Sequence, residues 1–341
     1  MKYLFNIFNF FLLLNAVVLP QPGVRYLDAV FTDVDVTSDI EYGESVAYDG
    51  RKVKLLLDIY APANDTVTER PLIVFIHGGG FKSNDKVGQF NSLFAGSFAK
   101  RGYVVASVNY RLSPSSMSQS EEYFKSLYRA VQDAKAAVRF FRTTAGIYKI
   151  NINQIFAAGS SAGAMTALHL AYMDQDEVPS FIDINEMGTI EGTGGNPGPS
   201  SKVQGVINLW GAMWNINWIE ENDAPVFNVH GMADKTVPYD SSSTYHGFTY
   251  GSKIIYDQAA AKHIKSGLIL FENTGHTLDH DIAKQDSVIS EAAFWLYSVF
   301  IKGHSMNTGH TAPFRKYSGR NDETSGYGEF VRLNREHRKI F

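Results

Sequence analysis

A G-S-S-A-G pentapeptide beginning at Gly159 carries the most distinctive chemistry of the chain. It stands between a short predicted strand, residues 155–158, and a predicted helix of small residues, 162–172. A Gly-x-Ser-x-Gly pattern at a strand-to-helix turn is typical of a tight elbow that exposes its central serine. Ser161 has that central place, so we predict that it is a nucleophile.

An H-G-G-G-F motif beginning at His77 directly follows a continuous apolar run at residues 72–76. Three glycines let backbone N–H groups approach an acyl oxygen without hindrance from a Cβ atom. We therefore predict an oxyanion hole formed by the amides of Gly79, Gly80 and Ala162, with His77 orienting the loop. A phosphate-binding loop fits less well, because no Lys-Ser/Thr pair follows the glycines.

A serine nucleophile needs a general base, and the base needs a carboxylate to orient it. Asp234 ends the sequence H-G-M-A-D after a predicted strand at 226–229, and His276 ends E-N-T-G-H after another at 268–271. Open α/β sheets hold their sites at the carboxyl ends of strands. The chain order Ser, Asp, His also suits such a sheet. We predict a catalytic triad of Ser161, His276 and Asp234.

Other histidines compete for these roles. His230 is an alternative base, but it lies four residues before Asp234 and at the end of a predicted strand. His276 and His280 have the spacing of a metal-binding pair, yet no glutamate stands in the H-E-x-x-H position. Asp223 is interpreted as a loop acid. We therefore predict no metal and no cofactor.

Tryptophans follow the predicted strand at 203–209 and suggest how a substrate is held. Trp210 and Trp214, with Phe81 of the glycine motif, are the predicted substrate-binding residues, because aromatic rings stack on phenolic or sugar rings. The alternative is that the tryptophans, Trp210, Trp214 and Trp218, cover the edge of the sheet, where large aromatic residues often pack.

The elements that must position these residues alternate between strand and helix. This alternation predicts an α/β fold with a mostly parallel central sheet, helices on both faces and a small insertion after the helix that follows Ser161. The Gly/Pro-rich residues 174–202 form that insertion, which we place on the surface. Strands are predicted at 40–48, 53–60, 72–76, 103–108, 155–158, 203–209, 226–229 and 268–271, and helices at 89–100, 121–142, 162–172, part of 243–263, and 282–301.

Composition excludes several classes of protein. The 341 residues include no cysteine, which excludes a disulfide framework, a cysteine nucleophile and thiolate metal sites. The net charge is −4 and the sequence has no basic cluster, so we expect no surface that binds nucleic acid. Hydrophobic residues make up 44%, enough for a sizeable core.

The two ends of the chain differ from its centre. Residues 1–20 resemble a signal peptide, with Lys2 before an apolar stretch and Pro20 after it; an uncleaved anchor and a buried element are the alternatives. We expect a catalytic domain at 21–302, then a polar, extended tail at 303–341. The protein would be secreted or periplasmic, without a stable membrane span once the signal is removed. The sequence leaves the oligomeric state open.

On these motifs the chain resembles α/β-hydrolase-fold serine esterases over residues 45–302. The H-G-G-G-F loop, N-Y-R-L from Asn109 and G-x-S-A-G are similar to hormone-sensitive-lipase-like carboxylesterases. The acid motif H-G-M-A-D-K-T-V-P differs from the Asp-Pro-Leu type of that family. The combination more closely resembles the exported feruloyl/acetyl-xylan-esterase-like branch, the BD-FAE-like family. This resemblance implies a carboxylesterase acting on short-chain or aryl esters, or on esters linked to plant polysaccharide.

Two other functions share parts of this pattern. A prolyl-oligopeptidase-like serine peptidase has the same triad order, but it typically carries a large N-terminal domain and lacks the three-glycine loop. A non-catalytic binding protein can use the same fold, since fold does not determine function. Such proteins tend to lose a member of the triad, whereas all three candidates are present here.

Overall fold

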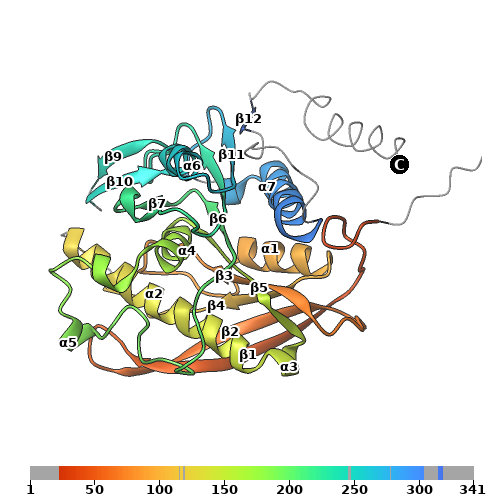
Figure 1. Cartoon of the computed structure of the whole chain (residues 1–341), viewed down its shortest axis with the longest axis horizontal. Coiled ribbons are helices and arrows are strands. Elements are labelled where there is room, and N and C mark those ends of the chain that lie inside the picture. Colours follow the sequence, from red (N-terminus) through yellow and green to blue (C-terminus); the bar gives the residue numbers. More distant parts are fainter. Residues whose placement is uncertain are drawn as a thin grey trace, which may run out of the picture.

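The computed structural model describes residues 23–302 and 314–317, except residues 115, 118, 119, 245, 246 and 277. Within this part of the chain the largest sheet has nine strands in the order β1-β2-β4-β3-β5-β6-β8-β11-β12 (Figure 1). Its strands are β1 Val34–Val46, β2 Lys52–Pro62, β3 Arg70–Ile76, β4 Val104–Val108, β5 Ile150–Ser160, β6 Gly205–Leu209, β8 Val226–Gly231, β11 Ser266–Phe271 and β12 Phe314–Tyr317.

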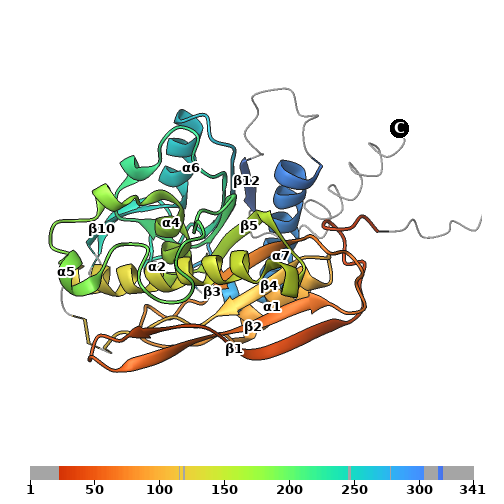
Figure 2. The same ribbon diagram turned by 60° about the horizontal axis from the view of Figure 1, so that its bottom comes forward.

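Antiparallel pairing is confined to one edge of this sheet. β1 pairs antiparallel with β2, and β2 pairs antiparallel with β4. Strands β1 and β2 form a long hairpin along the bottom of the molecule in Figure 2. All further neighbours are parallel, from β4 and β3 to β11 and β12. The predicted mostly parallel sheet is confirmed.

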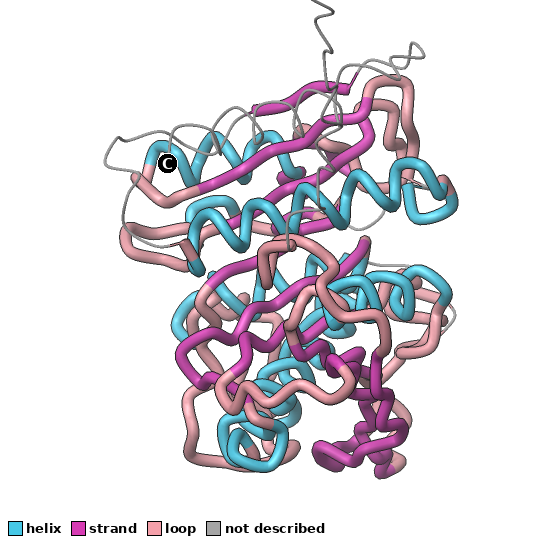
Figure 3. The backbone as a smooth tube through the Cα atoms, turned by 90° about the vertical axis from the view of Figure 1, so that its right-hand side faces the viewer, coloured by secondary structure: helices cyan, strands magenta, loops and turns pink. Residues whose placement is uncertain are grey.

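Helices cover both faces of the sheet (Figure 3). Buried side chains of α2, α4 and α6 belong to one core cluster, and those of α1 and α7 belong to the other. The α-helices are α1 Gln89–Ala99, α2 Ser120–Thr143, α3 Ala145–Tyr148, α4 Ala162–Tyr172, α5 Ile184–Met187, α6 Ser252–Ala261 and α7 Ile282–Leu296. Short 3₁₀ turns lie at η1 Gln175–Glu177, η2 Ile216–Trp218 and η3 Leu278–His280.

The position of β3 between two helix layers explains why residues 71–76 are apolar without interruption. Leu72 and Val74 contact the first cluster, whereas Ile73 and Phe75 contact the second. Successive side chains of a strand point to opposite faces, so a strand between two helix layers needs apolar residues at every position. All seven residues of β3 are buried. The site described below forms at the carboxyl end of this strand and its parallel neighbours.

The prediction that a helix occupies part of residues 243–263 is confirmed by α6, which begins at Ser252. Strands β9 Ser241–Thr244 and β10 Gly247–Gly251 precede α6, and they form a three-stranded sheet with β7 Ala212–Met213. The segment before α6 contains threonine and aromatic residues, which favour extended structure. The last predicted helix also divides, into α7 and a π-helical turn, η4 Tyr297–Ile301.

The insertion after α4 is more firmly packed than a surface loop. Ile182 and Ile190 are 4% and 3% exposed and belong to the core cluster. Glu191 accepts hydrogen bonds from Lys135 at 3.1 Å and from Arg139 at 2.9 Å, both on α2. The prediction of a purely superficial segment was wrong, because these ion pairs and apolar contacts hold the insertion against α2.

The termini fall mostly outside the described residues. The predicted signal peptide, 1–20, lies there entirely, and so does the predicted tail apart from residues 314–317. Those four residues form β12, which pairs in parallel with β11 at the edge of the sheet. Within the described residues, no helix has both the length and the apolar character needed to cross a bilayer.

Candidate active site

The elbow between β5 and α4 presents Ser161 with a positive φ of 53°, a strained backbone conformation for a residue with a side chain. The flanking glycines are required because the chain passes very close to itself. A Cβ atom on Gly163 would lie 2.0 Å from the carbonyl oxygen of Ile76 at the end of β3. A Cβ atom on Gly159 would lie 2.3 Å from the backbone of Gly163. The G-S-S-A-G pattern is therefore a steric consequence of the elbow.

His276 reaches this serine from the loop after β11. Its Nε2 atom lies 2.8 Å from the Oγ atom of Ser161, although the two residues are 115 positions apart in the chain. Its Nδ1 atom lies 2.6 Å from the Oδ2 atom of Asp234. The structure thus brings together the three side chains that the sequence indicated.

Asp234 is held as an anion at the carboxyl end of β8. Its side chain is 0% exposed, and its Oδ1 atom accepts hydrogen bonds from the amides of Thr236 at 2.8 Å and Val237 at 3.0 Å. Burial alone raises the pKa of a carboxyl group, but hydrogen bonds from His230 and His276 outweigh it and hold the pKa of Asp234 well below its usual range.

This carboxylate decides which tautomer His276 adopts. An ionised carboxylate only accepts hydrogen bonds, so Nδ1 of His276 carries the proton. The lone pair of Nε2 then faces the hydroxyl of Ser161, which is the arrangement that a general base requires.

The glycine loop lies beside the serine. A Cβ atom on Gly78 would lie 3.3 Å from the Cβ atom of Ser161, which measures how closely the two backbones approach. Gly79 and Gly80 have φ values of 109° and 60° and line the same cavity as Ser161. Ala162 is the first residue of α4, directly after the serine. The three residues predicted to supply oxyanion donors therefore lie near the nucleophile, two in the glycine loop and one at the start of α4.

His77 holds this loop from behind. Its Nδ1 atom lies 2.7 Å from the carbonyl oxygen of Gly78, and its ring stacks on Tyr110 with centroids 4.3 Å apart. Tyr110 also donates to the carbonyl of His77 at 3.1 Å. Burial lowers the pKa of His77 to about 4, so its imidazole is neutral near pH 7. These contacts fit the orienting role that the sequence suggested.

The cavity in front of Ser161 has a volume of about 570 Å³, and both polar and apolar residues line it. Aromatic and amide side chains from α1 and α2 line it together with the loops after β3, β8 and β11. Its lining includes Lys82, Gln89, Phe90, Asn91, Tyr123, Trp210, Thr236, Val237 and His280. The cavity can therefore offer both a ring-stacking surface and hydrogen-bonding groups.

Only one of the three predicted aromatic residues lines this cavity. Trp210 does so, with its ring centroid 5.6 Å from that of Phe90. Phe81 is 0% exposed and packs its ring edge-on against Tyr123. Trp214 packs against Phe124 on α2 at 4.6 Å. The placement of Phe81 and Trp214 in the substrate wall is corrected, because both rings are used in packing.

The sequence reasoning missed Phe90 and Tyr123, which line the cavity from α1 and α2. Both face inward because of how their helices dock, and no motif distinguishes them. Asn91 was missed for the same reason.

The competing residues also have definite places. His230 is 0% exposed and contacts Asp234, Val237 and Ser252, so it lies behind the carboxylate and away from the cavity. His280 is exposed and lies at the cavity. Among the residues that the structure describes, no three or more His, Cys, Asp or Glu side chains are arranged to hold a metal ion.

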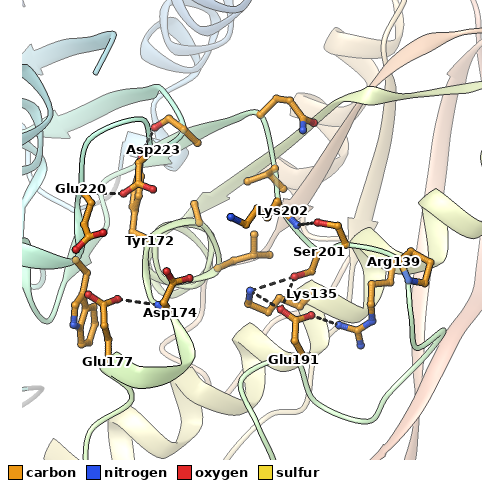
Figure 4. A pocket seen from close by; sticks show the side chains of 18 of the residues that line it. Lys135, Arg139, Tyr172, Asp174, Glu177, Glu191, Ser201, Lys202, Glu220 and Asp223 are labelled. Carbon is orange, nitrogen blue, oxygen red and sulfur yellow. Dashed lines mark hydrogen bonds and ion pairs between the residues drawn. The ribbon is translucent and has the colours of Figure 1, made fainter. Parts of the chain in front are cut away.

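A second cavity, of about 670 Å³, lies at the opposite ends of the strands (Figure 4). Its walls include Val203 just before β6, Pro225 just before β8, and Tyr172 at the end of α4. On one side Glu191 accepts hydrogen bonds from Lys135 and from Arg139, while Asp174, Glu177, Glu220 and Asp223 gather on the other, as Figure 4 shows. Asp223 accepts from the amide of Glu220 at 2.7 Å, as expected for a loop acid.

The sheet order, the elbow and the converging side chains are those of the α/β-hydrolase fold. Residues 57–213 match the family model described as BD-FAE. These residues extend from β2 through the elbow to β7. The resemblance to BD-FAE-like serine esterases that the motifs indicated is therefore confirmed.

Solved structures show the same fold. Esterase 2 of Thermogutta terrifontis phosphoramylated by tabun has a TM-score of 0.57 and 21% identity, covering 79% of this chain and 96% of that one. The propionate-bound structure of the esterase of this planctomycete has a TM-score of 0.56 and 21% identity, covering 75% and 94%. At these identities the likeness concerns the fold.

Two curated relatives match shorter stretches. A probable isoprenylcysteine alpha-carbonyl methylesterase ICME of Oryza sativa subsp. japonica is 28% identical over 156 residues, 46% of this chain and 33% of the relative. A neuroligin-like protein, glit-1, of Caenorhabditis elegans is 34% identical over 115 residues, 32% of this chain and 15% of the relative. The chain thus spans a third or less of the length of either relative.

Proposed function

We propose that the protein is a serine carboxylic-ester hydrolase that cleaves short-chain or aryl esters through an acyl-enzyme on Ser161. The observation that carries this proposal is the continuous contact from Ser161 Oγ to His276 Nε2, at 2.8 Å, and from His276 Nδ1 to Asp234, at 2.6 Å. A nucleophile, a base and an orienting acid in this geometry have the roles of a serine hydrolase triad.

In the proposed reaction Ser161 attacks the ester carbonyl while His276 takes the hydroxyl proton. Asp234 keeps His276 in its Nδ1–H tautomer and stabilises the imidazolium that forms. The amides of Gly79, Gly80 and Ala162 stabilise the oxyanion of the tetrahedral intermediate. His276 then protonates the leaving alcohol, and water releases the acyl group by the same route.

Three findings support esters as the substrates. The family model carries the BD-FAE description, the structural neighbours are named esterases, and one curated relative is named a methylesterase. The three-glycine loop distinguishes this chain from the peptidase alternative. The cavity also supports a second candidate, feruloyl or acetyl esters linked to polysaccharide, since Trp210 and Tyr123 stand beside the amides of Gln89 and Asn91.

Labelling with a fluorophosphonate probe tests the proposal. We expect one modified peptide, containing Ser161, and no labelling of the Ser161→Ala variant. The same variant should lose at least about a thousandfold in p-nitrophenyl acetate hydrolysis, as triad deletions do in other hydrolases. Retention of more than a tenth of the activity, with the variant folded, would refute the assignment.

A panel of acetyl, butyryl, longer acyl and feruloyl esters tests the substrate class. Preference for acetyl and butyryl esters supports the short-chain assignment, and preference for feruloyl esters or acetylated xylan supports the second candidate. We also propose export on the strength of the apolar N-terminal segment. N-terminal sequencing of the secreted product should then begin near residue 20.

A further inference from the structure

A chain of buried polar side chains continues behind the catalytic acid. Asn208 on β6 and Asn228 on β8 stand opposite each other in the parallel ladder, and Nδ2 of Asn208 donates to Oδ1 of Asn228 at 2.8 Å. Nδ2 of Asn208 also donates to Oγ of Ser252, the first residue of α6, at 3.1 Å. All three residues are 0% exposed. Burying several polar groups inside a sheet is costly unless each has a partner.

This series of hydrogen-bonded side chains continues from Ser252 to His230 and then to Asp234. Oγ of Ser252 lies 2.7 Å from Nδ1 of His230. On the other side of the ring, Nε2 lies 2.8 Å from the carbonyl oxygen of Val237 and 3.3 Å from Oδ2 of Asp234. Oδ2 is the same oxygen that accepts from His276. Two imidazoles therefore share one carboxylate oxygen.

Hydrogen-bond chemistry assigns the tautomer of His230. The carbonyl of Val237 can only accept, so Nε2 of His230 carries a proton. Nδ1 then accepts from the hydroxyl of Ser252, whose oxygen in turn accepts from Asn208. Every atom in this arrangement has a partner while the ring is neutral. Its Nε2–H is shared between Val237 and Asp234.

We propose that His230, fixed by Ser252, is a positioning residue for the reaction: it holds Asp234 so that Oδ2 faces His276. It closes the loop of residues 230–237 by its bond to Val237, while the amide of Val237 binds the other carboxylate oxygen. The carboxylate is thus held at both oxygens. Ser161 is then aligned through His276, and His230 itself touches no substrate. This inference rests on the proposed function.

Replacement of His230 by leucine tests the role. The variant leaves Oδ2 of Asp234 with His276 as its remaining side-chain donor, so the carboxylate is less firmly oriented and its charge is less shared. We expect kcat to fall about 10- to 100-fold with KM unchanged, as for small misplacements of catalytic groups. Without the hydrogen bond from His230, the carboxylate of Asp234 attracts the imidazolium form of His276 more strongly. The acid limb of the kcat/KM profile should therefore move to higher pH, by about 0.5 unit or more.

His230→Gln is the conservative variant, because its amide can still donate to Asp234 and Val237. It should recover most of kcat and the wild-type acid limb. If His230 had a purely structural role, its replacement would lower the melting temperature and leave the acid limb in place. The proposal is overturned if the acid limb of the leucine variant coincides with the wild type, or if glutamine does no better than leucine.

Ser252→Ala keeps the test decisive if the leucine variant does not fold. It removes the donor to Nδ1 of His230, and we expect kcat to fall about 3- to 10-fold. Ser266→Ala is the matched control, since Ser266 is also a 0% exposed serine but bonds the carbonyl of Tyr256. Its kcat should stay at the wild-type value. Equal kcat values for the two alanine variants would overturn the proposal.

Proton NMR separates this inference from the proposed function. The short contact between His276 Nδ1 and Asp234 should give a far-downfield proton signal, assigned by its loss in His276→Gln. In His230→Leu the signal should move, and in His230→Gln it should return. If the wild type hydrolyses no ester and binds no fluorophosphonate, the proposed function fails, while this signal still decides the positioning role. An unmoved signal in His230→Leu counts against that role.

Discussion

The backbone N–H of Ala233 donates to the carbonyl of Thr274 over 2.9 Å. This bond joins the loop that carries Asp234 to the loop that carries His276, 42 residues further along the chain. The two loops follow β8 and β11, which are parallel neighbours in the sheet. The acid and the base are therefore set in place by the sheet and by a direct loop contact before any substrate binds, which reduces the cost of orienting them during the reaction.

Asp234→Asn should lower kcat by about 10³- to 10⁴-fold, because a neutral amide neither selects the Nδ1–H tautomer of His276 nor stabilises its imidazolium. Steady-state hydrolysis of an activated ester measures the loss. Asp223→Asn is the control, since Asp223 lines the second cavity at the opposite ends of the strands. Comparable losses in both variants would contradict the role of Asp234.

Acid should destabilise the protein through His169, which is 0% exposed on α4. Burial lowers its pKa from 6.5 to about 4, so the unfolded chain binds the proton more readily than the folded one. The stabilisation is complete above about pH 6.5 and is lost as the pH falls toward 4, by up to about 3 kcal/mol.

Urea unfolding between pH 7.5 and 4.5 measures this dependence. His169→Asn should show a shallower fall in the free energy of unfolding than the wild type. His263→Asn is the matched control, because His263 is exposed and its φ of 58° suits asparagine. Parallel curves for wild type and His169→Asn would show that another group carries the effect.

Two helical glycines should respond oppositely to alanine. Gly163→Ala places a Cβ atom 2.0 Å from the carbonyl oxygen of Ile76, so the elbow must shift and both stability and activity should fall. Gly96→Ala meets nothing within 4 Å on α1 and should raise the free energy of unfolding by about 0.5–1 kcal/mol. Thermal unfolding of both variants provides the comparison, and a stable, fully active Gly163→Ala would contradict the elbow geometry.

Trp210 and Trp214 should separate binding from packing. Trp210 lines the cavity although it is only 1% exposed, so Trp210→Ala should lower the melting temperature and also raise KM for aryl esters more than for acetyl esters. Trp214→Ala removes a ring packed on Phe124 and should lower the melting temperature with KM unchanged. The opposite pattern would place Trp214, and not Trp210, at the substrate.

The sequence alone determined which residues form the candidate site, because its motifs lie at strand ends and have distinctive residue types. The elbow around Ser161, the glycine loop after β3, and the loops ending at Asp234 and His276 each have a local signature. Alternating strand and helix patterns also determined the class of fold, since every buried strand needs apolar residues on both faces.

Only the tertiary structure decided which groups surround that chemistry. Phe81 and Trp214 have the residue types of a substrate wall, yet burial of their rings against Tyr123 and Phe124 stabilises the core. His230 has the residue type of a base, yet the side chains of α6 and β6 place it behind Asp234. The direction in which a side chain faces depends on how helices and strands from distant parts of the sequence pack together. The local sequence pattern does not specify that packing.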